Sequence, residues 1–219
     1  LPPTPMNYAG AIFDQDGLLF DTEITYQRAW IEAGRRQGVT IEPELPRRFC
    51  GLGRDLIAGL AREAHPELDI PLYCTTAIEI AWENQLASVP EKKKGLLEML
   101  TFCRENGIRT AVASSSTLKV VRHNLEAAGV IGYFDAITTG DEVVHSKPAP
   151  DIFELAARKI GLDPRACVVF EDAFSGIRGA HAAGCGAVLV PDQSQPTEEI
   201  LAICTAYPDL GAARDVFRR

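Results

Sequence analysis

The chain has 219 residues, of which 46% are hydrophobic and 24% charged, and its 22 Lys and Arg against 30 Asp and Glu give a net charge of −8. Such a chain folds as one large globular domain or as a domain with a sizeable insertion, which excludes the disordered, collagen-like and coiled-coil classes. The negative charge argues against nucleic acid or an anionic membrane as a general partner, because binding a polyanion needs a basic face.

Short apolar runs, typical of buried strands, alternate along the chain with segments whose apolar residues have helical spacing. We expect strands at Tyr8–Phe13, Ile108–Ala113, Ala136–Thr139, Cys167–Phe170 and Ala187–Val190. We expect helices between them at Gly95–Glu105, Leu118–Ala128, Asp151–Ile160 and Gly176–Ala183. Alternation of this kind is typical of a parallel sheet covered by helices on both faces. The sequence therefore predicts an α/β fold with a doubly wound, Rossmann-like parallel sheet.

The connection between the first two strands is far longer than the roughly 30 residues of an ordinary crossover. It has helical patterning at Ile24–Gln37, Arg54–Ala64 and Leu72–Leu86. We therefore predict a helical cap domain over residues 22–90, inserted into an α/β core made of residues 1–21 and 91–219.

Cysteine usage and the lack of apolar runs bear on the location of the protein. No apolar run approaches the ~18–20 residues needed to span a bilayer, and the opening Leu-Pro-Pro-Thr-Pro lacks the features of a signal peptide. An even number of cysteines leaves a disulfide set open, although a chain with a full apolar core does not need one. We predict a cytoplasmic protein with six reduced cysteines, namely Cys50, Cys74, Cys103, Cys167, Cys185 and Cys204.

Polar side chains gather at the carboxyl ends of the predicted strands, where open parallel sheets bind their ligands. They are Asp14, Asp16, Ser114, Ser115, Lys147, Glu171 and Asp172. Four carboxylates in one crevice repel one another unless a cation compensates them, and an all-oxygen ligand set favours Mg²⁺. The lysine and the serine hydroxyls remain as donors for an anion held against that metal. A phosphoryl group fits this arrangement best.

The spacing of Asp14 and Asp16 adds a reaction type to this site. One carboxylate could attack phosphorus directly, as in enzymes that form an aspartyl phosphate. The other could protonate the leaving oxygen and later deprotonate water.

Four ordered motifs make the chain resemble the haloacid dehalogenase superfamily of phosphohydrolases. They are Asp14-Gln-Asp16-Gly, Val112-Ala-Ser114-Ser, Ser146-Lys147-Pro-Ala-Pro-Asp and Phe170-Glu171-Asp172-Ala-Phe-Ser-Gly. The long segment after the first motif is similar to the helical cap of the branch that includes sugar-phosphate phosphatases, phosphoglycolate phosphatases and β-phosphoglucomutases.

The resemblance implies roles for the residues that match the first three motifs. It implies that Asp14 is the nucleophile and a Mg²⁺ ligand, and that Asp16 is the acid/base, with its backbone carbonyl on the metal. It implies that Ser114 and backbone amides near Ser115 bind the phosphoryl group, while Lys147 fixes both nucleophile and phosphate.

The fourth motif implies further metal ligands. The resemblance makes Asp172 a ligand and leaves Glu171 either a direct ligand or a residue just behind the ligands. Neighbouring side chains of a strand point to opposite faces, so we expect direct contact from Asp172 rather than Glu171.

Substrate choice is expected to lie in the cap. Arg54 is our candidate for binding a distal anionic group or hydroxyl of the substrate, although a surface arginine at a helix start is the alternative. We interpret Trp30 and Trp82, which lie on helical patterns, as core residues of the cap rather than as residues that stack on a ligand.

Departures from the family patterns narrow the activity. The acid/base Asp16 argues against dehalogenation. Residues 22–90 contain no lysine, which argues against a phosphonatase and weighs against a β-phosphoglucomutase, whose histidine position corresponds here to Tyr26. We predict a monomeric Mg²⁺-dependent phosphatase for a small phosphorylated metabolite, such as a sugar phosphate. A β-phosphoglucomutase-like phosphotransferase and a non-catalytic regulatory or binding protein on the same fold remain the alternatives.

Overall fold

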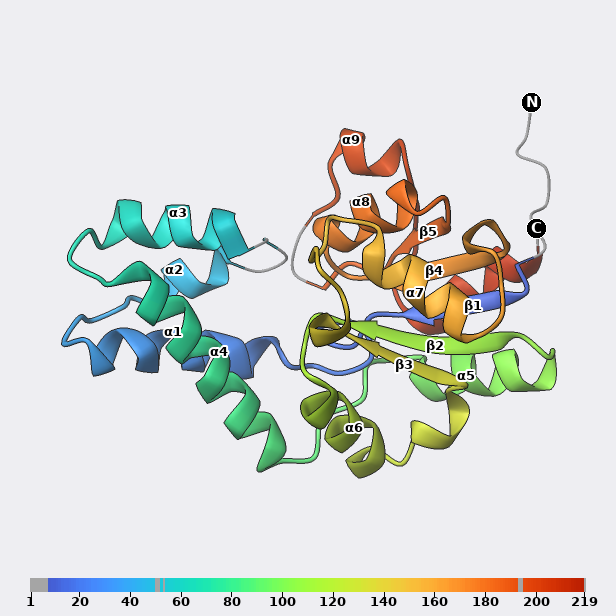
Figure 1. Ribbon diagram of the computed structural model, residues 1–219, viewed down its shortest axis with the longest axis horizontal. Helices are drawn as coiled ribbons and strands as arrows, with labels where there is room; N and C mark the ends of the chain where they lie inside the picture. Colours follow the sequence, from blue (N-terminus) through green and yellow to red (C-terminus); the bar gives the residue numbers. More distant parts are fainter. Residues whose placement is uncertain (1–7, 50–51, 53, 193–194, 219) are drawn as a thin grey trace.

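A parallel sheet forms the centre of the molecule in the computed structural model, which describes residues 8–49, 52, 54–192 and 195–218 (Figure 1). Among these residues, six strands pair in the order β3-β2-β1-β4-β5-β6, and every neighbouring pair is parallel. The strands are β1 (Gly10–Phe13), β2 (Arg109–Ser114), β3 (Ala136–Thr139), β4 (Cys167–Glu171), β5 (Gly186–Leu189) and β6 (Thr205–Ala206). The five predicted strands are confirmed. The sixth escaped prediction because two exposed residues at a sheet edge carry no pattern.

Helices cover both faces of the sheet, as predicted for a doubly wound fold. They are α5 (Leu96–Glu105), α6 (Leu118–Ala127), α7 (Asp151–Lys159) and α8 (Phe174–Ala182). Figure 1 shows α5 and α6 on one side of the sheet and α7 and α8 on the other. Side chains alternate along β1, so that Ala11 and Phe13 pack with α5 and α6 while Ile12 packs with α7. Burial on both faces explains why these strands are nearly continuous apolar runs.

A separate lobe of helices lies between β1 and α5 in the sequence (Figure 1). Its elements are α1 (Glu23–Arg36), α2 (Glu44–Arg47), α3 (Arg54–Ala64) and α4 (Ile70–Leu86). The start of α4 lies two residues before the predicted one, because Asp69 accepts a hydrogen bond from the backbone N–H of Leu72 and Pro71 occupies the first turn.

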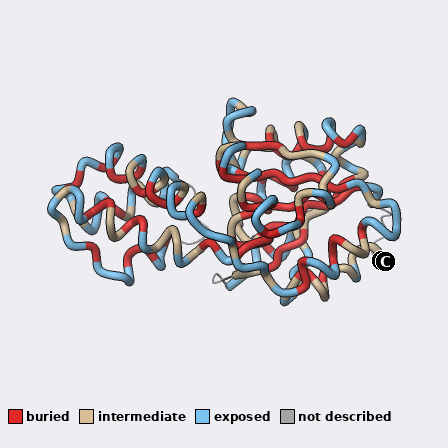
Figure 2. The backbone as a smooth tube through the Cα atoms, turned by 90° about the horizontal axis from the view of Figure 1, so that it is seen from below, coloured by how far each residue is buried: buried red, intermediate tan, exposed pale blue. Residues whose placement is uncertain are grey.

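This helical lobe has a hydrophobic cluster of its own. At its centre the ring of Trp30 lies 5.2 Å from the rings of both Phe49 and Tyr73, measured between centroids. Figure 2 shows buried segments in the lobe and in the sheet region, joined by a narrow neck. These observations support the proposed division into a core (residues 1–21 and 91–219) and a cap (residues 22–90).

The two connections between lobe and sheet run side by side. The backbone N–H of Asp21 donates to the carbonyl of Glu91 at 3.0 Å, and the N–H of Lys93 donates to the carbonyl of Leu19 at 2.9 Å. Both connections lie beyond the carboxyl end of β1. This arrangement keeps the helical lobe next to the edge of the sheet where the predicted site residues lie.

Short elements complete the fold. They are the helices α9 (Glu198–Leu201) and α10 (Leu210–Ala213) and the 3-10 helices Ile131–Tyr133, Gly140–Glu142, Pro164–Ala166 and Arg214–Arg218. Four-residue helices are too short to show a helical period, which is why α2, α9 and α10 were not predicted. Among the described residues, no helix has both the length and the apolar character needed to cross a membrane.

Candidate active site

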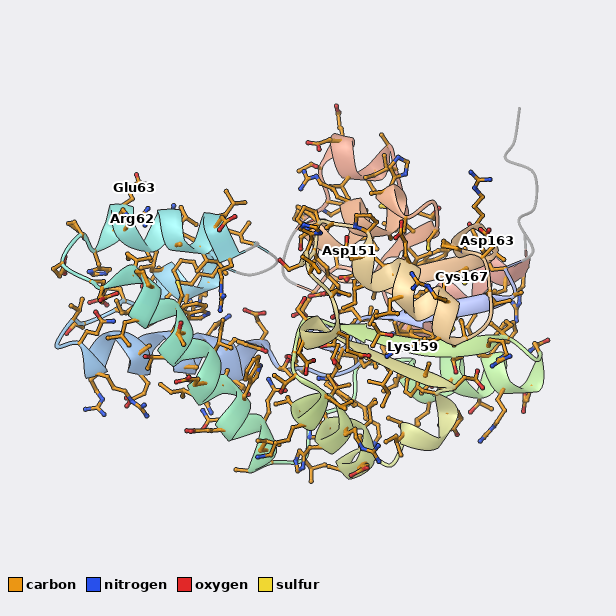
Figure 3. All side chains as sticks on the ribbon, viewed as in Figure 1. Arg62, Glu63, Asp151, Lys159, Asp163 and Cys167 are labelled. Atoms are coloured by element: carbon orange, nitrogen blue, oxygen red, sulfur yellow. The ribbon has the colours of Figure 1, made fainter. Side chains whose placement is uncertain are left out.

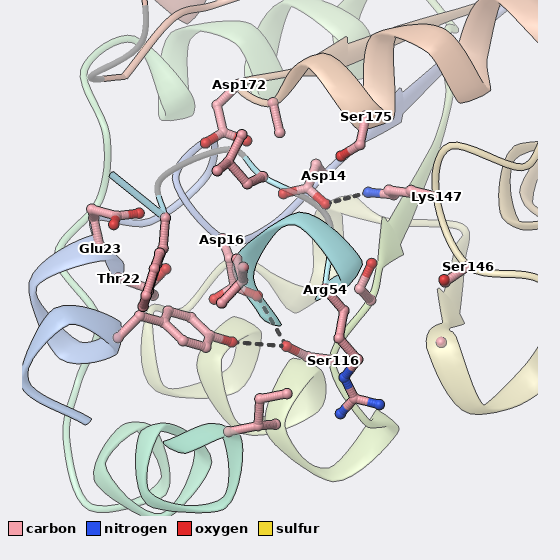
Figure 4. Close-up of a pocket in the computed structure, with 18 of the residues that line it drawn as sticks. Asp14, Asp16, Thr22, Glu23, Arg54, Ser116, Ser146, Lys147, Asp172 and Ser175 are labelled. Carbon is pink, nitrogen blue, oxygen red and sulfur yellow. Dashed lines mark hydrogen bonds and ion pairs between the residues drawn. The ribbon is translucent and has the colours of Figure 1, made fainter. Parts of the chain in front are cut away.

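The ammonium group of Lys147, in the third motif, bonds to a residue of each of the other three motifs at the carboxyl edge of the sheet. The Nζ of Lys147 donates to Asp14 Oδ1 at 2.5 Å (Figure 4). It also donates to Glu171 Oε1 at 2.6 Å and to the carbonyl of Ala113 at 3.0 Å. Asp14 directly follows β1. Its backbone N–H donates to the carbonyl of Phe170, which continues the hydrogen bonding between β1 and β4 and holds the backbone of Asp14 in place. All three charged side chains are at least nine-tenths buried, so these charge-assisted bonds lie in a low-dielectric setting.

Burial and neighbouring charges shift the pKa values of Asp14, Glu171 and Lys147 in opposite directions. Desolvation raises the pKa of Asp14, and the neighbouring ammonium of Lys147 opposes that shift. Desolvation likewise raises the pKa of Glu171, to about 7, again against the ammonium. For Lys147, burial disfavours the charge, but the two carboxylates outweigh burial and raise its pKa above the ordinary value. The lysine therefore stays protonated at neutral pH.

Three carboxylates converge beside the lysine. Asp14, Glu171 and Asp172 each offer an oxygen atom, and these atoms lie within 4.8 Å of one another. Burial and the charges of Asp14 and Glu171 raise the pKa of Asp172 well above its usual range. A cation among these oxygens would offset that repulsion, and a hard, all-oxygen donor set fits Mg²⁺.

The chain approaches Asp172 through a glycine. Gly17 has a φ of +83°, and a Cβ atom built on it would lie 2.2 Å from Asp172 Oδ2. Only glycine adopts this conformation readily and leaves room for the carboxylate. The first motif therefore needs its glycine for the acidic cluster to form.

Strand alternation does not separate Glu171 from Asp172. Glu171 is the last residue of β4, Asp172 lies beyond the strand, and oxygens of both reach the acidic cluster. Gly176 of α8 makes room for Glu171, since a Cβ atom there would lie 2.0 Å from Glu171 Oε1. Our reason for preferring Asp172 as the direct ligand was therefore wrong, and the ligand roles of both residues stay predictions.

Asp16 has surroundings different from those of Asp14. Its Oδ2 accepts a hydrogen bond from Ser116 Oγ at 3.0 Å, and this hydroxyl lies 3.4 Å from the hydroxyl of Tyr26. Asp16 Oδ1 is buried and has no hydrogen-bond partner within the described part of the chain. Burial, together with the charge of Asp14, raises the pKa of Asp16 to about 6. A carboxyl group with a pKa in this range can both donate and accept a proton near neutral pH.

The three consecutive serines after β2 have three different positions. Ser114 is fully buried and does not line the cavity, and its Oγ accepts a hydrogen bond from the backbone N–H of Ser116 at 3.1 Å. Ser115 is exposed and lines the cavity, and Ser116 lines it beside Asp16. Sequence reasoning missed Ser116, although a run of three serines at a strand end was the available signal.

A cavity of about 530 Å³ lies over these residues, between the sheet edge and the helical lobe. The lobe contributes mostly apolar and aromatic side chains to its wall, namely Tyr26, Trp30, Phe49, Leu52, Ile57, Ile78 and Trp82. Arg54, the first residue of α3, also lines it and makes no ion pair or hydrogen bond with any described residue. The structure therefore brings every predicted site residue except Ser114 to one cavity.

The fold and this site define a class of protein. A parallel α/β sheet that carries buried carboxylates and a lysine at its carboxyl edge, under a helical lobe, is typical of an enzyme that handles a cation and an anionic group together. The model of the haloacid dehalogenase-like hydrolases matches residues 8–184. The chain belongs to this family, and it is an enzyme.

The chain is also similar to individual named proteins and solved structures. The fructose-1-phosphate phosphatase YqaB of Escherichia coli K12 is 36% identical over 184 residues, which cover 83% of this chain and 95% of that protein. Hexitol phosphatase B of the same organism is 31% identical over 196 residues, 86% of each chain. The crystal structure of CbbY from Rhodobacter sphaeroides in complex with phosphate is similar with a TM-score of 0.74 and 27% identity, over 93% of this chain and 95% of that one.

Proposed function

We propose that the protein is a Mg²⁺-dependent phosphatase that hydrolyses small phosphomonoesters, with sugar phosphates as its substrate class, through a phosphoaspartyl intermediate. The observation that carries the proposal is the buried Lys147, bound to Asp14 and Glu171, with Asp16 two residues further on in a different setting. The two relatives named as phosphatases of sugar and hexitol phosphates support the substrate class.

In the first half-reaction, a carboxylate oxygen of Asp14 attacks phosphorus in line with the leaving oxygen. A bond forms between this oxygen and phosphorus while the bond from phosphorus to the leaving oxygen breaks, and Asp16 donates its proton to that oxygen. The unpartnered Asp16 Oδ1 is the atom free to do so, because Oδ2 is held by Ser116. A phosphoaspartyl group and a free alcohol result.

In the second half-reaction, Asp16, now ionised, accepts a proton from a water molecule whose oxygen attacks phosphorus. The bond between Asp14 and phosphorus breaks, inorganic phosphate leaves, and both carboxyl groups return to their starting states. Lys147 holds Asp14 in position throughout by its hydrogen bond.

Asp14, Glu171 and Asp172 would hold the Mg²⁺ ion, with the backbone carbonyl of Asp16 as a further proposed ligand. When bound, the ion supplies positive charge that balances the negative charge of the phosphoryl oxygens. Backbone amides near the exposed Ser115 are proposed phosphate donors. Ser114 is buried and does not line the cavity, so its hydroxyl could contribute only if the side chain turned toward the phosphate.

Three further proposals concern Arg54, the oligomeric state and the location of the enzyme. We propose that Arg54, which has no described partner, binds a distal hydroxyl or anionic group of the substrate. We also propose a monomeric, cytoplasmic enzyme. The five described cysteines are free, which supports this location, while Cys50 lies outside the described residues.

The experiment is phosphate release from a panel of sugar phosphates, phosphoglycolate and nucleotides, measured with Mg²⁺ and with EDTA. We expect Mg²⁺-dependent release that falls by at least about 10³-fold in Asp14→Asn, since removing a nucleophile removes the reaction path. Asp215→Asn, at an exposed aspartate near the end of the chain, is the matched control.

Two results would contradict the proposal. Isomerisation of β-glucose 1-phosphate faster than phosphate release would indicate the mutase alternative. No turnover of any substrate would indicate a binding protein on this fold.

A further inference from the structure

Helix α4 has apolar residues on two faces. One face packs into the hydrophobic cluster of the helical lobe through Tyr73, Ala77 and Ala81. Ile78 and Trp82, one turn apart, line the cavity instead. A helix that is apolar on two faces needs a partner for each of them. The second apolar face, formed by Ile78 and Trp82, faces the cavity.

Both tryptophans of the helical lobe line the cavity, but they differ in burial and packing. Trp30 is 6% exposed and is held between the rings of Phe49 and Tyr73, as expected of a core residue. Trp82 is only half-buried and belongs to none of the hydrophobic clusters found among the described residues. Our interpretation of Trp82 as a core residue was therefore wrong. Its indole surface is available to a molecule in the cavity.

Trp82 lines the cavity together with the proton donor of the proposed reaction, Asp16. Tyr26 lines it as well, and its hydroxyl lies 3.4 Å from Ser116 Oγ. Ser116 in turn donates to Asp16. If Asp16 serves the leaving oxygen, the carbon atoms attached to that oxygen would lie on the Tyr26 side of the cavity, whose wall also contains Trp82.

The charges around the cavity indicate which carbon skeleton fits. The cavity wall contains two cationic side chains, Lys147 and Arg54, and Lys147 is already bound to two carboxylates. With the proposed Mg²⁺ and Lys147 offsetting the acidic cluster, the carboxylates of Glu23 and Asp141 remain on the cavity wall against Arg54. A leaving group with its own negative charge would be repelled by these carboxylates, and only the positive charge of Arg54 would oppose this repulsion. Hydroxyl groups are compatible with carboxylates, because they can donate hydrogen bonds to them.

We propose that Ile78 and Trp82 form the binding surface for the carbon skeleton of the leaving group, and that this surface selects monophosphates of neutral polyols or sugars over small phosphorylated acids. The C–H face of a polyol would pack on the indole ring, while its hydroxyls would face Tyr26, Arg54 and the carboxylates. The proposal rests on the proposed phosphatase function for the position of the substrate.

The test compares a hexitol phosphate with phosphoglycolate, whose leaving group is short and anionic. In Trp82→Ala, we expect the ratio of kcat/KM for hexitol phosphate to that for phosphoglycolate to fall about tenfold, mainly through KM. Trp82→Phe keeps an aromatic face and should retain most of the ratio. Glu79→Ala, at an exposed position of the same helix, is the matched control and should leave the ratio unchanged. An equal loss for both substrates, or no loss, would overturn the inference.

Binding without turnover separates this inference from the proposed function. In the Asp14→Asn background, we expect Trp82→Ala to raise the Kd for hexitol phosphate about tenfold, measured by calorimetry. Phosphate release by the wild type, combined with a Kd that does not depend on Trp82, would overturn the inference and leave the function standing. Binding that depends on Trp82 in a protein that hydrolyses neither substrate would overturn the function and leave the inference standing.

Discussion

Replacing Lys147 by methionine would remove the positive charge on which the buried acidic cluster depends, while nearly keeping the length of the side chain. In the wild type the ammonium bonds to Asp14, Glu171 and a backbone carbonyl, and the side chain is 8% exposed. The substitution leaves two buried carboxylates without their partner. Breaking a buried pair from one side costs about 3–5 kcal/mol, because the remaining charge stays desolvated.

The loss should depend on pH. In the variant, burial raises the pKa values of Asp14 and Glu171 without opposition from the ammonium, so both lie above their unfolded values. A carboxyl group with a raised folded pKa binds its proton more tightly in the folded state, so its stabilising effect is present at low pH and is lost as pH rises. Glu171 already has a pKa of about 7 in the wild type. The stability loss caused by Lys147→Met should therefore be larger at pH 8.5 than at pH 5.5, by at least about 1.4 kcal/mol.

The assay is urea denaturation in EDTA, followed by circular dichroism at both pH values, with the free energy of unfolding extrapolated to water. EDTA keeps a divalent ion from replacing the missing charge. The matched control is Lys159→Met at the end of α7 (Figure 3). Lys159 also pairs with a glutamate, Glu142, and with a carbonyl, but its side chain is 29% exposed, so we expect a loss below about 1 kcal/mol.

Two results would refute this reasoning. One is a loss at pH 8.5 no larger than that of the Lys159→Met control, which would mean that the buried charges do not need the ammonium. The other is an equal loss at both pH values, which would mean that the carboxyl groups do not take up protons when Lys147 is absent.

Further substitutions and labelling test other parts of the site and core. Gly17→Ala should destabilise the protein more than Gly129→Ala and should abolish phosphate release. Both glycines have a positive φ, but only a Cβ atom at position 17 would collide with Asp172. Equal shifts in melting temperature for the two variants, with phosphate release retained, would contradict this. Burial raises the pKa of the Cys103 thiol to about 12, so this cysteine should resist iodoacetamide in the native protein at pH 8 and react only in urea, as mapped by mass spectrometry; prompt native labelling would show that it is accessible.

The sequence alone determined the class of fold and most residues of the candidate site. Buried strands are continuous apolar runs, and helices repeat every 3.6 residues, so both leave a signal along the chain that does not depend on distant contacts. The carboxyl ends of parallel strands meet at one edge, which is why the positions of Asp14, Lys147 and Asp172 along the chain are enough to predict that they lie together.

The tertiary structure decided what depends on side-chain direction and on contacts between distant segments. The burial of Ser114, the hydrogen bond from Ser116 to Asp16 and the reach of Glu171 into the acidic cluster follow from rotamers and from the close approach of α8 at Gly176. These contacts join residues that local periodicity treats independently.

The difference between the two tryptophans is of the same kind. Trp30 and Trp82 both lie on amphipathic helical patterns, and the sequence offers the same interpretation for both. Both rings reach the wall of the cavity, but only the packing of α4 against α1 makes the Trp30 ring part of the hydrophobic cluster of the helical lobe and leaves the Trp82 ring outside that cluster. Periodicity predicts that a residue is apolar and on a helix face, whereas the packing of the helices determines whether that face meets the core or a ligand.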